Sequence, residues 1–236
     1  MPSTFCESAE QREKKMLAIG SRIEIDRQQL LRSLGYGNFT PPARVTVLIH
    51  DYLENIPELI EPSFSYVIKD LVLVWGSSTV IEGPSVFQSE VVSRLLERCD
   101  KVAVFIVTLG SYLEEMVQCL AEDKLILQAA VLDAIGSAAV EVLIESVRDR
   151  IKRSASIEGL GVSRYFGPGH CDWDLSQQES VFRALGENHS GVQLTDGYLM
   201  LPQKSATGII GIGQSPEIED YNPCRACEKQ DCSGRR

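Results

Sequence analysis

The spacing of apolar residues predicts two helices in the first part of the chain. Residues 25–34 carry an apolar stripe, and Asp26 stands where an N-cap would be expected. Residues 45–60 also repeat apolar positions at helical spacing, with Pro57 placed to bend or end that helix. Residues 1–20 are polar and rich in charge, so we expect a solvated N-terminal arm before these helices.

Strand-like and helical patterns follow one another through the middle of the chain. Residues 101–108 read KVAVFIVT, an unbroken β-branched and aromatic run typical of a strand inside a sheet. Shorter strands are expected over residues 64–68 and 71–75, and an amphipathic helix over residues 85–98. Further helices are expected over residues 111–121 and 124–151, the second being a candidate central helix because of its small residues.

The last third of the sequence predicts a loop, a helix and a hairpin. Residues 167–170 read GPGH, a sharp turn whose backbone N–H groups suit a ligand. A helix over residues 175–187 follows, with strands at 192–195 and 206–212 joined through residues 202–205. The whole pattern predicts an α+β fold, with an antiparallel or mixed sheet flanked by helices. We expect a folded domain over residues 21–215 and a separate tail over residues 216–236.

Composition excludes several classes of function. The chain has 236 residues, 44% of them hydrophobic, which is enough for a substantial core. Its net charge of −10 argues against a nucleic-acid surface, which requires clustered Lys and Arg. We find no apolar run of about 18 residues and no apolar N-terminus, and we therefore expect no membrane span, no secretory signal and a cytoplasmic location.

Several motifs in order resemble a known family. They are P-G-x-x-D-W, a short helix, G-V-x-L-T, M-x-P-x-K-S and G-I-I-G-I-G, preceded by LLRSLGYG and AVLDAIGSAAVE. This series resembles the activation domain of cobalamin-dependent methionine synthase and its free-standing, single-domain relatives. The resemblance implies binding of S-adenosylmethionine and reductive methylation of cobalamin held by a separate methionine synthase or other corrinoid protein. It also implies an electron donor such as flavodoxin or ferredoxin.

The resemblance further implies which residues contact the ligand. The loop at the ligand comprises Gly167, Pro168, Gly169 and His170, and the K-S pair beside it is Lys204 and Ser205. The acidic groups near the ligand are Asp133 and Glu141. Arg164 is the candidate residue for binding the carboxylate of the ligand. The pattern departs from the family in two places. The family has Arg four positions before the loop glycine, where this chain has Tyr165, and it has Tyr where this chain has His170.

Three of the seven cysteines crowd into the tail. Cys224, Cys227 and Cys232 form C-x2-C-x4-C, which supplies thiolates at a spacing suited to zinc or an iron–sulfur cluster. A fourth ligand would have to come from Cys171, from Asp231 or from a second protein. The alternative is an exposed tail whose thiols have no role.

The sequence contains no nucleophile–base motif of the hydrolase kind, so we expect no catalytic side chains. The leading hypothesis is a stand-alone reactivation module. A second hypothesis is a metal- or iron–sulfur-binding redox accessory protein for a corrinoid methyltransferase, with a decayed S-adenosylmethionine site. A third is a purely structural interaction subunit.

Overall fold

The computed structural model describes residues 23–37, 39–83, 85–187, 189–214, 218–219 and 221–225. The chain divides into two compact units. The helical unit comprises Met1–Ser63, Val107–Ile144 and Leu201–Ser205. The sheet unit comprises Phe64–Ile106, Glu145–Met200 and Ala206–Arg236. The predicted arm over residues 1–20 and most of the predicted tail lie outside the described residues.

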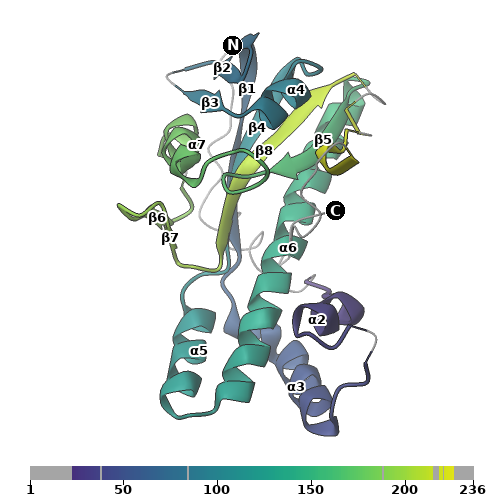
Figure 1. Cartoon of the computed structure of the whole chain (residues 1–236), viewed down its shortest axis with the longest axis vertical. Coiled ribbons are helices and arrows are strands. Elements are labelled where there is room, and N and C mark those ends of the chain that lie inside the picture. Colours follow the sequence, from purple (N-terminus) through teal and green to yellow (C-terminus); the bar gives the residue numbers. More distant parts are fainter. Residues whose placement is uncertain are drawn as a thin grey trace. The chain divides into compact units, whose positions relative to one another are not determined.

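The helical unit is built from amphipathic helices, as predicted. It holds α2 (Arg27–Ser33), α3 (Ala43–Leu59), α5 (Tyr112–Glu122) and the first part of α6 (Ile126–Ile157) (Figure 1). The Asp26 side chain caps α2 by accepting from the backbone N–H groups of Gln28 and Gln29, which confirms the expected cap. Pro57 lies inside the last turn of α3, which ends two residues later. Buried residues of this unit include Leu30, Ile49, Leu113, Leu132 and Ile135.

A six-stranded sheet forms the centre of the sheet unit. Its strands lie in the order β3-β2-β1-β4-β8-β5, and the registered pairs β1–β2, β2–β3 and β5–β8 are antiparallel. The strand bounds are Ser63–Trp75 (β1), Ser78–Ile81 (β2), Val86–Gln88 (β3), Lys101–Thr108 (β4), Gly161–Phe166 (β5) and Ser205–Gly213 (β8). The predicted α+β class, with an antiparallel sheet flanked by helices, is therefore confirmed.

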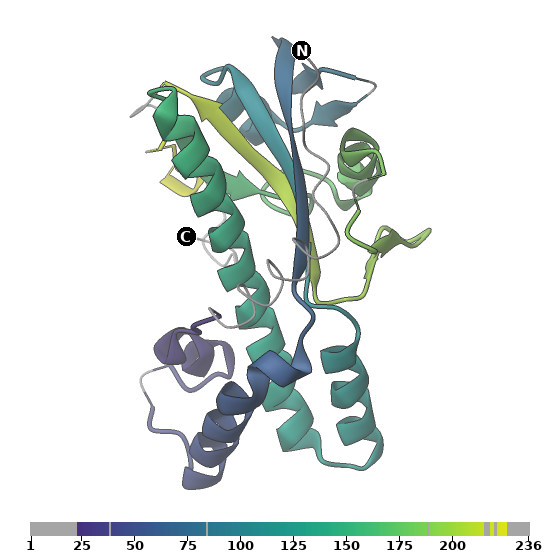
Figure 2. The same ribbon diagram turned by 180° about the vertical axis from the view of Figure 1, so that it is seen from behind.

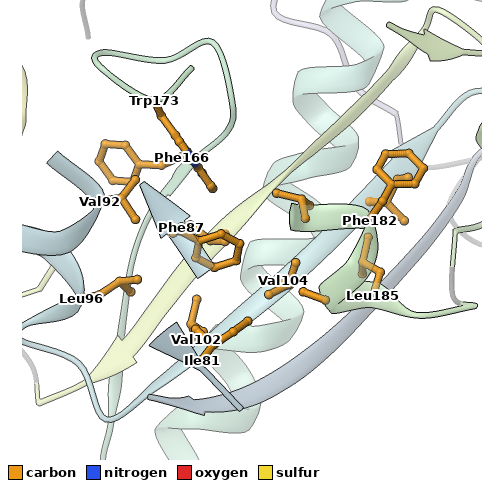
Figure 3. Packing of buried hydrophobic residues seen from close by; sticks show 14 of the residues in the cluster. Ile81, Phe87, Val92, Leu96, Val102, Val104, Phe166, Trp173, Phe182 and Leu185 are labelled. Atoms are coloured by element: carbon orange, nitrogen blue, oxygen red, sulfur yellow. The ribbon is translucent and has the colours of Figure 1, made fainter. Parts of the chain in front are cut away.

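The helices α4 (Glu90–Leu96) and α7 (Gln178–Leu185) cover one face of this sheet. Alternate residues of β4 (Val102, Val104 and Ile106) pack against both helices in the main hydrophobic cluster, which Figure 3 shows from close by. The end of α6, from Glu145 onwards, lies behind the sheet in Figure 1 and in front of it in Figure 2. The buried run of β4 is thus covered on both faces, as its continuous apolar sequence predicts.

Two predictions in the middle of the chain were wrong. Residues 64–68 and 71–75 belong to one strand, β1, because the backbone ladder continues between them: the Asp70 carbonyl accepts from Glu82 N at 2.9 Å. The expected helix over residues 85–98 is instead strand β3 followed by the shorter helix α4. Phe87 is fully buried between exposed neighbours, which is the period of a strand, and the Ser89 hydroxyl then caps α4 through Val92 N.

The C-terminal hairpin also differs from the prediction. The strand expected at residues 192–195 is the two-residue β6 (Gln193–Leu194), and it pairs with β7 (Met200–Leu201) in a separate small sheet. Strand β8 pairs instead with β5, which the sequence analysis did not predict as a strand. The helix expected over residues 175–187 begins as a 3-10 turn, η1 (Leu175–Gln177), before α7.

Helix α6 is long and apolar enough to cross a membrane by length and composition, contrary to the expectation of no such run. The core helix of a soluble protein passes the same test, so the finding is weak evidence for a span. Its buried residues recur at helical spacing, as in Leu132, Ile135, Ala139 and Leu143, and polar residues separate them. This periodicity favours a helix packed within a folded protein over one surrounded by lipid.

Candidate functional site

The predicted ligand loop is a closed turn that uses its own donors. Gly167 N donates to the His170 Nδ1 atom (3.2 Å), and His170 N donates to the Gly167 carbonyl (2.9 Å). Gly169 N donates to the Trp173 carbonyl (2.7 Å). In this structure the turn itself satisfies these N–H groups, and the ligand role of the turn stays a prediction. The Gly167 and His170 carbonyls and the His170 Nδ1 atom act as acceptors within the same segment.

Close packing fixes the start of this turn against β8. A Cβ atom added at Gly167 would lie 2.6 Å from the Thr207 carbonyl oxygen, a distance that side-chain carbons do not tolerate. Gly169 has φ +93°, a left-handed backbone conformation that favours glycine. The buried Thr207 hydroxyl also donates to the Gln178 side chain at the start of α7. Both glycines of the GPGH motif are thus required by the backbone path.

Arg164 and Tyr165 are neighbours on β5 that differ in burial. Tyr165 is 6% exposed, and its ring centroid lies 6.1 Å from that of Phe105 and 5.6 Å from that of His170. Arg164 is exposed and lines a depression of about 470 Å³ together with Glu145, Arg148, Tyr165 and Glu219. No other predicted ligand residue lines this depression. The aromatic Tyr165 therefore stands beside the turn, at the position where the family has Arg.

The depression around Arg164 is strongly polar. Arg148 donates through Nε to the Ser163 carbonyl (3.0 Å) and through a terminal nitrogen to Glu145 (3.1 Å). Glu219 forms an ion pair with Lys152 at 3.4 Å. Such a mixture of guanidinium and carboxylate groups can bind a zwitterion or a single carboxylate.

In the helical unit, Lys204 is paired with the predicted acidic residue Asp133. The Lys204 Nζ atom lies 2.7 Å from the Asp133 carboxylate and donates to the Ser137 hydroxyl (2.9 Å). Its side chain is only 13% exposed, whereas that of Asp133 is 53% exposed. The Lys204 stem lies over Gly136, where a Cβ atom would come within 3.2 Å of Lys204 Cε. The small residues of α6 thus admit the lysine, and a ligand cation would compete with it for Asp133.

The remaining predicted residues of this unit have structural contacts. Ser205 lies within hydrogen-bonding distance of the Thr108 hydroxyl (2.8 Å) and the Pro202 carbonyl (2.6 Å). The Glu114 carboxylate accepts from the backbone N–H groups of Gln203 and Lys204 and so fixes the entry to β8. Glu141 is partly buried on α6. Sequence reasoning missed Glu114, because its partners lie about ninety residues away and no local motif marks them.

The structure thus separates the predicted ligand residues into two sets. Asp133, Glu141, Lys204 and Ser205 belong to the helical unit, and Arg164, Gly167, Pro168, Gly169 and His170 belong to the sheet unit. Within the sets, Asp133 contacts Lys204, and Gly167 contacts His170.

Of the three predicted metal ligands, Cys224 is among the residues that the structure describes. Cys224 lies in a short 3-10 turn, η2 (Pro223–Arg225), where its N–H donates to the Asn222 side chain (3.0 Å); Cys227 and Cys232 lie outside the described residues. In the part of the chain that the structure describes, no three His, Cys, Asp or Glu side chains gather as a metal site would require. The metal site at the tail stays a prediction.

The comparisons with known proteins agree with this fold. The structure resembles a crystal structure described as the MetH reactivation domain bound to AdoHcy, with a TM-score of 0.62 and 15% sequence identity, over 92% of this chain and 78% of that chain. A search of curated proteins found no match. Residues 86–232, more than half of the chain, match the family described as vitamin B12 dependent methionine synthase, activation domain. The chain therefore belongs to the family of activation domains of vitamin B12-dependent methionine synthase.

Proposed function

We propose that this protein is a stand-alone reactivation module that binds S-adenosylmethionine and supports reductive methylation of cobalamin on a separate methionine synthase or corrinoid protein. The observation that carries the proposal is the family match over residues 86–232, which includes the GPGH turn, β8 and the Lys204–Ser205 pair. The relative of known structure is described as binding AdoHcy, the product that remains when S-adenosylmethionine loses its methyl group. A cytoplasmic location is part of the proposal.

In the proposed reaction, the methyl group of S-adenosylmethionine passes to the reduced cobalt of the partner's cobalamin. Its bond to sulfur breaks, sulfur keeps the electron pair, and S-adenosylhomocysteine leaves. A flavodoxin or ferredoxin supplies the electron that returns the cobalt to its reactive state. This chain contributes binding and orientation of the methyl donor, because the nucleophile belongs to the partner.

The sheet unit offers groups that suit parts of this ligand. The turn presents carbonyl oxygens, which suit an amino group, beside the rings of Tyr165 and His170, which suit adenine or ribose. Arg164, in its depression, suits the methionine carboxylate of the ligand.

In the helical unit, the predicted acidic residue Asp133 is already paired, because the Lys204 Nζ atom lies 2.7 Å from its carboxylate. The sulfonium and ammonium groups of S-adenosylmethionine favour carboxylates as partners. A ligand cation that binds Asp133 would therefore have to displace Lys204. The sequence alone predicts an acidic group near the ligand, and this ion pair differs from that expectation.

A second candidate function follows from that difference. The Lys204–Asp133 pair and Tyr165 at the family's Arg position both favour a decayed S-adenosylmethionine site. The protein would then be a metal- or iron–sulfur-binding redox accessory for a corrinoid methyltransferase, with Cys224, Cys227 and Cys232 as ligands.

Calorimetric titration separates the two functions. We expect S-adenosylmethionine to bind the purified full chain with a dissociation constant in the micromolar range, equivalent to about −8 kcal/mol. Arg164→Gln should weaken binding, whereas Arg153→Gln, an exposed arginine on α6, should not. Absence of heat at millimolar ligand, with zinc or iron in the same sample that Cys227→Ser removes, would replace the first function by the second.

A further inference from the structure

An aspartate beyond the ligand turn ties this loop to helix α4. Asp172 lies two residues after the last residue of the turn, His170, and its carboxylate accepts from the Ser89 hydroxyl (2.6 Å), from Glu90 N (2.6 Å) and from Val91 N (3.3 Å). The Ser89 hydroxyl accepts in turn from Val92 N (3.0 Å), so its single proton is directed at Asp172. One carboxylate thus accepts the hydrogen bonds of three donors at the start of α4, although it lies more than eighty residues further along the chain.

Two neighbouring contacts fasten the same segment to the same place. Trp173 is 1% exposed, and its ring packs edge-on against Phe87 of β3 with centroids 5.3 Å apart (Figure 3). The Gln177 side chain accepts from Gln88 N at 3.0 Å. The chain from Asp172 to Gln177 is therefore held against the end of β3 and the start of α4.

These anchors are connected to the turn through short backbone hydrogen bonds. The Trp173 carbonyl accepts from Gly169 N (2.7 Å), and Trp173 N donates to the His170 carbonyl (2.9 Å). Any shift of Asp172 and Trp173 consequently moves Gly169 and His170. The other end of the turn is fixed by Gly167 against Thr207, so Asp172 determines the position of its exposed side.

We propose that Asp172 is a positioning residue that holds the Gly167–His170 turn in the conformation that binds ligand. The proposal rests on the function proposed above, because the turn is taken as part of the S-adenosylmethionine site. Two carboxylate oxygens serve three donors here, which an amide cannot reproduce: its nitrogen would face the N–H or O–H groups of α4. Loss of the charge also removes a favourable partner for the first turn of a helix.

The test compares Asp172→Asn with Asp174→Asn in the full chain. Asp174 lies two residues further on, and among the described residues its carboxylate accepts from Ser176 alone, within η1, so its substitution makes the same chemical change without touching α4. Both variants are made with Trp75→Phe, which removes the exposed tryptophan and leaves Trp173 as the one tryptophan, so its fluorescence can be excited selectively over that of the tyrosines. The measurements are the dissociation constant of S-adenosylmethionine, the acrylamide quenching of Trp173 and the melting temperature.

We expect Asp172→Asn to weaken S-adenosylmethionine binding by about fivefold or more, because a displaced turn misplaces its ligand contacts. Quenching of Trp173 should increase in the same variant, and Asp174→Asn should change both by less than about twofold. A lower melting temperature with wild-type affinity and wild-type quenching would overturn the proposal, since Asp172 would then serve stability alone. If the Trp75→Phe parent does not bind S-adenosylmethionine, the proposed function fails; unchanged quenching in Asp172→Asn would additionally show that Asp172 does not hold the turn.

Discussion

At the scale of single residues, the ion pair between Lys204 and Asp133 has unequal partners. The lysine is mostly buried and the carboxylate is half exposed, so solvent screens much of their attraction. In a double-mutant cycle of Lys204→Met and Asp133→Asn, we expect a coupling of roughly 0.5–1 kcal/mol from urea unfolding, weaker at high salt. The looser pair of Lys101 and Glu158, at 3.7 Å, is the control and should couple less. Equal coupling in the two pairs would contradict this ranking.

A second residue-scale prediction concerns Cys99. Burial, with a smaller contribution from the charge of Asp100, raises the pKa of the Cys99 thiol to about 12. The folded protein therefore keeps this proton at pH values where the unfolded chain loses it, so stability falls as the pH rises from about 9 towards 12. At pH 10, iodoacetamide should modify Cys99 far more slowly than the exposed Cys119, as read by mass spectrometry. Equal rates would show that Cys99 is accessible as a thiolate.

At the scale of elements, the contact between β8 and β5 depends on a glycine. A Cβ atom at Gly208 would lie 2.4 Å from the Phe166 carbonyl oxygen and 3.1 Å from the Phe105 ring. We expect Gly208→Ala to destabilise the protein by about 1–3 kcal/mol in thermal or urea unfolding. Gly197→Ala is the matched control, since its added carbon would meet only the Thr195 hydroxyl at 3.9 Å. A wild-type melting curve for Gly208→Ala would mean that the two strands separate more easily than their packing indicates.

The elements also show which features a sequence can predict. The helices α2, α3, α5 and α6 and the strand β4 follow from their own periodicity, because each carries a complete apolar pattern. Strand β5 does not, since Gly161–Phe166 precedes the GPGH turn and owes its strand conformation to pairing with β8, more than forty residues away. The three-residue strand β3 was not predicted for a related reason. Its alternation of exposed and buried residues is too short to be distinguished from the start of a helix.

The candidate site likewise has features that the sequence predicts and features that it does not. The GPGH turn was predicted because glycine and proline at fixed positions dictate a local backbone path. The pairing of Lys204 with Asp133 and the hydrogen bond between Asp172 and Ser89 depend on long-range contacts, which no local pattern encodes. Residue types at a site can therefore be inferred from sequence, whereas their partners require the fold.

At the scale of the whole molecule, the sequence match and the structural match cover different extents. The family match begins at residue 86, after α2, α3 and β1, whereas the structural similarity covers 92% of the chain. The similarity of fold therefore extends beyond the residues that the family match covers.

Ligand-linked unfolding tests the proposed binding of S-adenosylmethionine on the intact chain. A ligand that binds only the folded state stabilises it by about 2.7 kcal/mol at one hundred times its dissociation constant. We expect S-adenosylmethionine and S-adenosylhomocysteine each to raise the melting temperature of the full chain by several degrees, roughly the shift that this free energy gives in a protein of this size. Methionine and adenosine, supplied separately, are the controls and should raise it less, since each satisfies only part of the site. An unchanged melting temperature in millimolar S-adenosylmethionine would contradict binding, and the cysteine tail would then become the functional element to study.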